Sequence, residues 1–166
     1  MIAHATAWLE GTALATWTRE SPSIWAYPTI LTLHTAGLGV VVGASAVIDL
    51  RLLGFGRRIP AAALAPLFAI IGWAFALNAT TGVVLFMADA TAKSKQVVFF
   101  VKLALIALAL WDTLAQRRLI LWDPALAGFT GDGAVELPIL KLRRLAVASL
   151  ILWTGAITAG RLMAYL

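Results

Sequence analysis

His34 is the residue of this sequence whose type and position most directly suggest chemistry. It lies roughly ten residues into an uncharged apolar segment, where an ionisable side chain is costly and is usually retained for function. Neutral imidazole is a common axial ligand of haem iron. Gly37 lies one helical turn away and would leave a hollow beside the ring, which a flat macrocycle could use. The alternative is a histidine whose ring N–H bonds a neighbouring helix.

Four further residues could take part in such a site. Asn78 and Thr81 lie three positions apart, on one face of a second apolar segment, where an amide needs a hydrogen-bond partner. Lys102 and Arg161 interrupt the third and fourth apolar segments on the same side of the membrane as His34, and they could meet the propionates of haem b. Alternatively, Asn78 joins two helices, and both basic side chains extend to the membrane interface.

Other candidates for metal or catalytic chemistry are weaker. A second axial ligand could come from His4, Met87 or Met163, but exposure of the histidine and ordinary packing of the methionines explain them at least as well. The chain has no cysteine, which excludes disulfides and thiolate ligands, and its two histidines disfavour a multi-ligand zinc site. The sequence contains no catalytic dyad, nucleophile elbow or phosphate-binding loop.

The amino-acid composition indicates the environment in which the helices that position these residues must fold. Hydrophobic residues make up 61% of the 166 residues and charged residues 13%, with a mean hydropathy of +0.91. A soluble domain is about 45–50% apolar and about 25% charged. Lipid must therefore be the main solvent. The net charge of +5 fits loops that face anionic lipid better than it fits nucleic-acid binding.

Four segments are long enough to cross a bilayer, which takes about 20 residues, and lipid forces all of them to be helical. The sequence therefore predicts an all-α, polytopic, four-transmembrane-helix bundle in a single domain, residues 1–166. The expected spans are residues 23–49, 60–88, 96–116 and 141–165.

The segments outside the spans also carry predictions. Residues 3–20 predict an amphipathic helix that lies at the interface, with Trp25 and Tyr27 in the aromatic belt. Met1 to Glu10 lacks a basic start, so no signal peptide is expected. The longest loop joins the third and fourth spans, and a turn is expected at residues 131–133.

Basic residues set the expected orientation. One side of the membrane holds eight of them: Arg51, Arg57, Arg58, Arg117, Arg118, Lys141, Arg143 and Arg144. The other side holds five: Arg19, Lys93, Lys95, Lys102 and Arg161. Because basic loops stay cytoplasmic, both termini are predicted to be periplasmic in a bacterial cytoplasmic membrane. Gly39 and Gly43 form a small-residue pair that predicts close helix packing, within one subunit or in a homo-oligomer.

Three strings of the sequence stand out together: Leu-His-Thr-Ala-Gly at 33–37, Asp-Leu-Arg-Leu-Leu-Gly at 49–54 and Thr-Gly-Val-Val-Leu-Phe-Met-Ala-Asp-Ala at 81–90. With others, they resemble a family of small, uncharacterised bacterial four-helix membrane proteins. The resemblance covers about the first 110 residues and implies no activity. A looser likeness is to four-helix membrane b-type cytochromes, which bind haem through two or four histidines on their spans. His34 is the residue here that matches that role.

These observations lead to two main hypotheses. The first is a haem b protein with a role in electron transfer or in redox or gas sensing, in which His34 binds the iron. The second is a non-enzymatic structural or oligomeric subunit, or a small-solute pathway, in which His34, Asn78 and Lys102 form a buried polar network. A quinone oxidoreductase has the least support, and a redox partner or quinone stays open.

Overall fold

A computed structural model describes residues 2–56, 58–123, 137–163 and 165 of the chain. All regular elements in that part are helical, as the sequence predicted. They are α1 (Ile2–Glu10), α2 (Ala13–Glu20), α3 (Tyr27–Leu53), the 3-10 helix η1 (Ala61–Leu64), α4 (Ala65–Ala88), α5 (Ala90–Lys93), α6 (Val97–Trp122) and α8 (Leu137–Leu162). The turn expected at residues 131–133 lies outside the described residues.

Four helices are long and apolar enough to cross a membrane: α3, η1 with α4, α6, and α8. The chain is therefore a multi-pass membrane protein with an all-α bundle. The third helix extends to Trp122, beyond the expected end at residue 116. It continues because Asp112 and Gln116 are buried among other helices, so these polar residues do not mark its end. The fourth helix begins at Leu137, earlier than the expected residue 141.

Local sequence explains where the first span begins and ends. Pro28 occupies the first turn of α3, where its missing N–H costs nothing. Gly54 caps the other end with a φ of 111°, a left-handed conformation that favours glycine. Its N–H bonds the carbonyls of Arg51 and Leu50. The chain then turns back, and Arg51 donates from Nε to the carbonyl of Ile59 across this turn.

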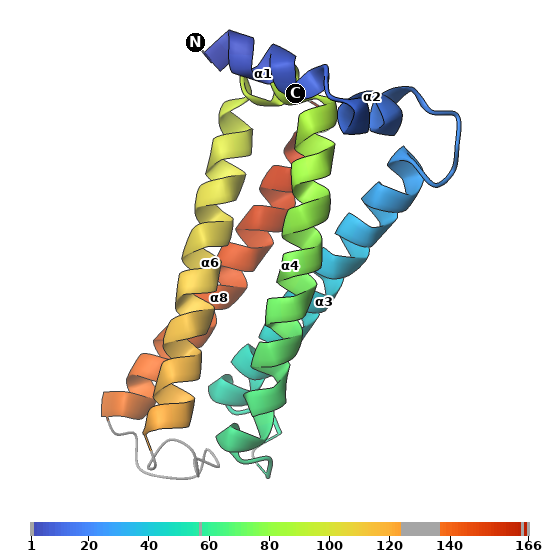
Figure 1. The fold of residues 1–166 in the computed structure, drawn as a ribbon. Helices are drawn as coiled ribbons and strands as arrows, with labels where there is room; N and C mark the ends of the chain where they lie inside the picture. The colour runs from blue at the N-terminus through green and yellow to red at the C-terminus, as the bar shows by residue number, and fades with distance from the viewer. Residues whose placement is uncertain (1, 57, 124–136, 164, 166) are drawn as a thin grey trace.

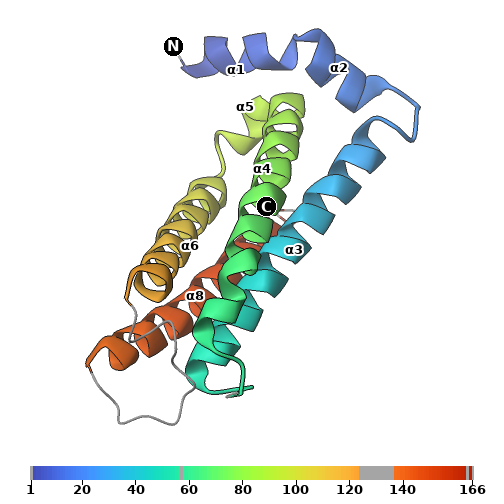
Figure 2. The same cartoon turned by 60° about the horizontal axis from the view of Figure 1, so that its bottom comes forward.

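The four spans form two packed pairs (Figures 1 and 2). Helix α3 packs along α4, α6 packs along α8, and α3 also contacts α8, whereas α4 and α6 scarcely touch. We call the half of the bundle near α1 and α2 the upper half, and the half near the α3–α4 turn the lower half (Figure 1). Near the upper end, the rings of Phe86 and Phe99 stack at 5.2 Å and connect α4 to α6.

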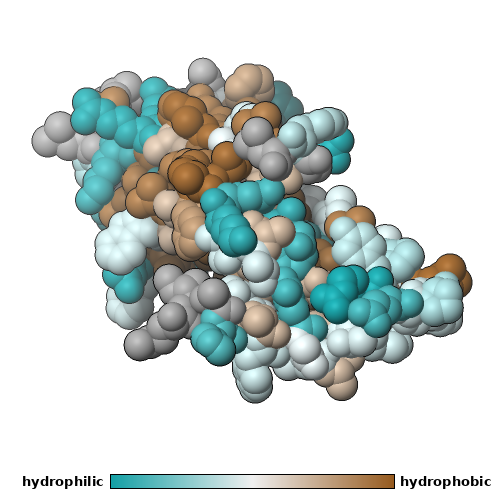
Figure 3. All heavy atoms as spheres, turned by 90° about the horizontal axis from the view of Figure 1, so that it is seen from above, coloured by the Kyte–Doolittle hydropathy of each residue, from teal (hydrophilic) through white to brown (hydrophobic). Residues whose placement is uncertain are grey.

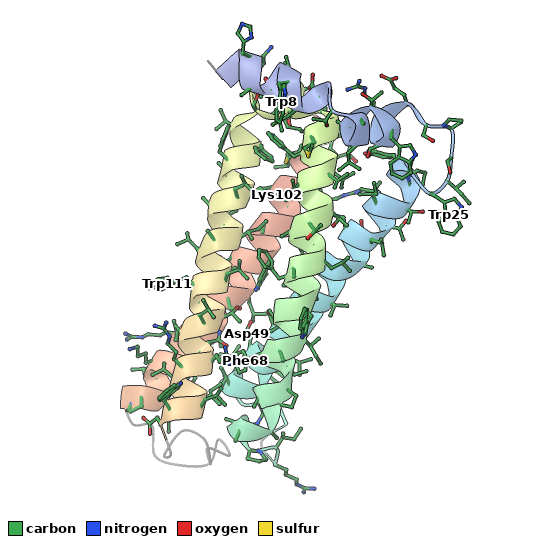
Figure 4. The ribbon with its side chains drawn as sticks, viewed as in Figure 1. Trp8, Trp25, Asp49, Phe68, Lys102 and Trp111 are labelled. Carbon is green, nitrogen blue, oxygen red and sulfur yellow. The ribbon has the colours of Figure 1, made fainter. Side chains whose placement is uncertain are left out.

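Large apolar side chains cover much of the outside of the bundle. Trp73 and Trp111 are 80% and 73% exposed, and Figure 4 shows Trp111 pointing away from the helices. Buried Val41, Ile48 and Ile71 belong to the core. In lipid, such a core is stabilised by close packing and hydrogen bonds more than by removal from water.

The segment predicted as one interfacial helix is two helices, which lie across the upper end of the bundle (Figure 1). The break falls at Gly11 and Thr12, and the Thr12 hydroxyl caps α2 by accepting the N–H of Ala15. Trp8 and Trp25 are exposed here, and this end mixes hydrophilic and hydrophobic residues (Figure 3). Such a mixture suits a membrane interface.

Glu10 attaches α1 to the linker between α4 and α6. Its Oε1 accepts the backbone N–H of Thr91 at 2.7 Å. This hydrogen bond holds the pKa of the Glu10 carboxyl below its usual value. Nearby, Arg19 donates to the carbonyl of Ala88 at 3.4 Å, so α2 also contacts the end of α4.

Candidate functional site

The first polar cluster joins α3 to α4 in the upper half and consists of His34, Asn78 and Thr81, which we call the upper cluster. Asn78 donates from Nδ2 to the backbone carbonyl of His34 at 2.7 Å. In return, His34 Nδ1 lies 2.9 Å from the backbone carbonyl of Asn78 and 3.2 Å from Thr81 Oγ1. The sequence predicted these three residues as neighbours, and the structure brings them together.

The partners of Nδ1 determine the form of the imidazole. Nδ1 lies 2.9 Å from Asn78 O, which can only accept, and 3.3 Å from Asn78 Nδ2, which can only donate. The shorter contact favours the tautomer in which Nδ1 carries the hydrogen and donates to Asn78 O. Thr81 donates its own hydrogen to the carbonyl of Leu77 at 2.8 Å, and it can therefore accept from the ring as well. Nε2 of neutral His34 then keeps a lone pair. An Nδ1–H bonded to a carbonyl is also how proteins orient histidines that bind metals.

The space beside Gly37 is occupied. A Cβ atom on Gly37 would lie 3.2 Å from the carbonyl oxygen of Ala74 and 3.3 Å from Asn78 Cβ, so α4 fills the hollow that the sequence suggested for a macrocycle. Across the interface, a Cβ on Gly82 would lie 3.0 Å from His34 Cε1. Both glycines let the helices approach closely around the ring. These contacts do not fit a haem on the Gly37 side.

Lys102 and Arg161 behave differently from each other. Lys102 is partly buried, points into the upper half (Figure 4) and packs over Gly160 of α8, where an added Cβ would lie 3.6 Å from Nζ. Its charge is near enough to act electrostatically on His34. Arg161 is exposed, in keeping with extension to the interface. His4 is exposed on α1.

A second polar cluster, which was not predicted from the sequence, joins three helices. It extends from the lower half of the bundle toward its middle. We call it the lower cluster: Ser45 and Asp49 on α3, Asp112 and Gln116 on α6, and Ser149 and Trp153 on α8. Each helix contributes two residues spaced four apart, which therefore share one helix face. Asp49 lies inside the bundle (Figure 4). It is 1% exposed, and Gln116 is 2% exposed.

Gln116 connects the two aspartates. Its Nε2 lies 2.9 Å from Asp49 Oδ1 and 2.8 Å from Asp112 Oδ2, so each N–H of the amide donates to a different carboxylate. The nitrogen must be the atom that faces them, because the amide oxygen could not bond two acceptors. Because they share one nitrogen, the two carboxylate oxygens lie within about 6 Å of each other.

Four buried polar atoms of the lower cluster have no hydrogen-bond partner in the part of the chain that the structure describes: Asp49 Oδ2, Ser45 Oγ, Ser149 Oγ and Trp153 Nε1. The Ser149 hydroxyl is close enough to Asp49 to influence its carboxylate, but it does not meet hydrogen-bond geometry. Buried polar groups are normally satisfied by protein or by a bound polar species. Four unsatisfied atoms on two facing helices therefore mark a place that can bind something small and polar.

The two aspartates also lack basic partners. Within the described residues, neither Asp49 nor Asp112 forms an ion pair, and both ion pairs found there, Arg19–Glu20 and Asp89–Lys93, lie at the upper end. A carboxylate away from water is costly unless its charge is compensated. The lower cluster is thus a buried anionic site, and no basic side chain of the described residues neutralises the negative charge of its two aspartates.

One signal in the sequence could have revealed the lower cluster. The pairs 45/49, 112/116 and 149/153 repeat the same four-residue spacing of polar or tryptophan residues in three of the spans. The third span was instead expected to end at residue 116, and no contact between it and Asp49 was predicted. In the structure Asp49 bonds Gln116, 67 positions away, which local patterns cannot show.

A groove of about 280 Å³ lies between α4 and α6 in the lower half. Its walls are mostly apolar, including Phe68, Ile71 and Leu110, and Arg117 also lines it. Apart from Arg117 it contains no ionisable side chain, so it offers a surface for lipid more readily than a site for chemistry.

Within the described residues, no three His, Asp or Glu side chains come together as a metal site would require. Searches of protein-family models, of curated proteins and of solved structures found no match to this chain, so its function has to be inferred from the two polar clusters themselves.

Proposed function

We propose that this protein is a non-enzymatic module of the bacterial cytoplasmic membrane that forms a pathway for a small ion. The observation that carries the proposal is the lower cluster, in which two aspartates and an amide are buried among membrane-spanning helices and no described residue is their basic partner. Ionisable residues at membrane depth are expensive and usually belong to ion or proton pathways.

The position of the two clusters supports a carrier more than an open pore. His34 and Asp49 lie fifteen residues apart on α3, about 22 Å along the helix axis. Val41, which is 1% exposed, lies between them and belongs to the apolar core. An apolar layer of this kind blocks continuous passage of water. We therefore expect slow, saturable movement of ions.

Proteoliposomes provide the test. The purified protein is reconstituted, and uptake of Na⁺, K⁺ and protons is measured against empty liposomes and against the Asp49→Asn variant. A faster flux of one of these ions, lost in Asp49→Asn and kept in Gly39→Ala, supports the proposal. Gly39 suits the control because an added Cβ there would meet no atom within 4 Å. Flux equal to that of empty liposomes for all three ions overturns it.

The same proposal includes the orientation. Eight of the thirteen basic residues lie in or near the helix segments and connections at the α3–α4 and α6–α8 ends of the spans in sequence, which supports a cytoplasmic lower end and periplasmic termini. A reporter fused to the C-terminus should then be active on the periplasmic side. A cytoplasmic readout would reverse the orientation.

Haem b binding at His34 is the second candidate, and one observation favours it. Nδ1 is held by a backbone carbonyl, which leaves Nε2 free to bind iron, with Lys102 nearby for a propionate. Since α4 covers Gly37, the macrocycle would have to approach from the Nε2 edge of the ring. A Soret band that is near stoichiometric with protein and lost in His34→Ala would support this candidate. A colourless protein purified from haem-replete cells would exclude it.

A further inference from the structure

We infer that the lower cluster binds one small monovalent cation of the Na⁺ type, held by Asp49 Oδ2 with the hydroxyls of Ser45 and Ser149. This inference deepens the proposed function by naming the ion and its ligands. The binding step can be measured without any transport, so the two proposals can fail separately.

Charge is the first argument. Asp49 and Asp112 lie on different helices and are drawn together by a single neutral amide. Gln116 satisfies one oxygen of each carboxylate, yet it contributes no positive charge. In a membrane interior, where opposing charges are poorly screened, a bound cation would stabilise this arrangement strongly.

The two serines are the second argument. Threonines of the same two helices, among them Thr35 on α3 and Thr154 on α8, donate to the carbonyl one turn earlier, as hydroxyls in membrane helices commonly do. Ser45 and Ser149 do not, although they are 3% and 1% exposed. Their hydroxyl oxygens remain available beside Asp49, from which Ser45 is one turn away and to which Ser149 is close across the α3–α8 interface.

The geometry around Gln116 indicates the charge of the ligand. Two carboxylates usually hold a divalent ion by bridging it, but here the two N–H groups of Gln116 occupy the bridging position. Among the buried atoms of the described residues that have no hydrogen-bond partner, what remains beside the serines is one carboxylate oxygen, Asp49 Oδ2, and the two neutral hydroxyls. Hard oxygens with a single formal charge match a monovalent alkali cation, with water or backbone carbonyls completing its shell. Trp153 Nε1, one turn from Ser149, could donate to such a water.

Thermal unfolding of the full chain in mild detergent tests the inference, with tryptophan fluorescence as the readout. NaCl replaces choline chloride at constant ionic strength. Because a ligand that binds the folded state raises the unfolding temperature, we expect a rise that saturates with Na⁺ concentration. An unfolding temperature that does not depend on Na⁺ in the wild-type protein would overturn the inference.

Single-residue variants show which side chains are responsible for the rise in unfolding temperature with Na⁺. Asp49→Asn should abolish the Na⁺ response and unfold at a higher temperature than wild type in choline, because it removes one of two facing charges. Ser149→Ala should shift the response to roughly tenfold higher Na⁺ for the loss of one ligand oxygen. Thr154→Ala is the matched control on α8, since its hydroxyl is exposed and bonded within the helix; it should respond as wild type does.

Each outcome has a clear consequence. If Asp49→Asn does not fold, the comparison of Ser149→Ala with Thr154→Ala still decides, and identical Na⁺ responses in these two variants would refute the ligand assignment. A saturable Na⁺ response without flux in liposomes keeps the cation site and rejects the pathway. Flux without a saturable Na⁺ response does the reverse.

Discussion

The contact between α3 and α4 at Gly37 makes the sharpest prediction about packing. In Gly37→Ala, the new methyl group would lie 3.2 Å from the carbonyl oxygen of Ala74 and 3.3 Å from the backbone nitrogen of Asn78. Backbone atoms cannot rotate away as a side-chain end can, so the two helices must separate by a few tenths of an ångström. Overpacking of this kind costs about 1–3 kcal/mol.

Gly39 on the same helix provides the comparison. Its added Cβ meets nothing within 4 Å, so Gly39→Ala gains the helix propensity of alanine, about 0.5–1 kcal/mol, without a packing cost. The propensity gain is the same in Gly37→Ala and cancels between the variants. Gly37→Ala should therefore be less stable than Gly39→Ala by about 1–3 kcal/mol.

Reversible unfolding in mixed micelles of dodecyl maltoside and dodecyl sulfate measures this difference, followed by circular dichroism. Equal stability of the two alanine variants would contradict the close approach of α3 and α4 at Gly37. If Gly39→Ala proved the less stable variant, the small-residue face at Gly39 and Gly43 would be the tighter contact, as in the homo-oligomer predicted from the sequence.

Three further predictions concern hydrogen bonds of individual side chains. Asn78→Ala should destabilise the bundle by about 0.6 kcal/mol, an average interhelical bond in a membrane, while Thr80→Ala on the exposed face of α4 should not, in the same micelle assay. Gln116→Leu should cost about 3 kcal/mol or more, since it leaves two buried carboxylates without their shared donor, and expression or unfolding temperature would report it. The pKa of Glu10 is lowered in the folded protein, so its bond to Thr91 is at full strength above the ordinary pKa near 4.5 and is lost as pH falls through the lowered value. Protection of the Thr91 amide against hydrogen exchange, relative to the intrinsic exchange rate at each pH, should therefore fall there, and in Glu10→Gln it should already be lower at neutral pH.

The four spans could be predicted from the sequence because the bilayer imposes length, helicity and apolar composition on each of them. The ends of the spans were less predictable. Asp112 and Gln116 suggested the end of a span. A polar residue after an apolar run can lie in water at the membrane surface, or it can be buried against a polar partner on another helix, as these two are. The break between α1 and α2 depends on Gly11 and the Thr12 cap, a local signal inside a segment that otherwise has one amphipathic pattern.

The upper cluster was predictable in part because His34 and Asn78 stand out in uncharged segments. Their depth alone indicated a common level in the membrane. The lower cluster was not predicted because its bonds join α3 to α6, and helix order in space does not follow from span order. The space beside Gly37 shows the same limit, since a small residue can create either a pocket or a close helix contact, and only the neighbouring helix decides. The resemblance to a four-helix family and the haem assignment stay predictions.

Direct binding of sodium tests the central claim, that Asp49 of the lower cluster holds a cation. Purified protein in detergent would be equilibrated with radioactive sodium, and bound ion counted per chain for wild type, Asp49→Asn and Thr154→Ala. We predict saturable binding of one Na⁺ per chain in wild type and Thr154→Ala, and none in Asp49→Asn. Absence of saturable binding in wild type, or equal binding in Asp49→Asn, would contradict the claim.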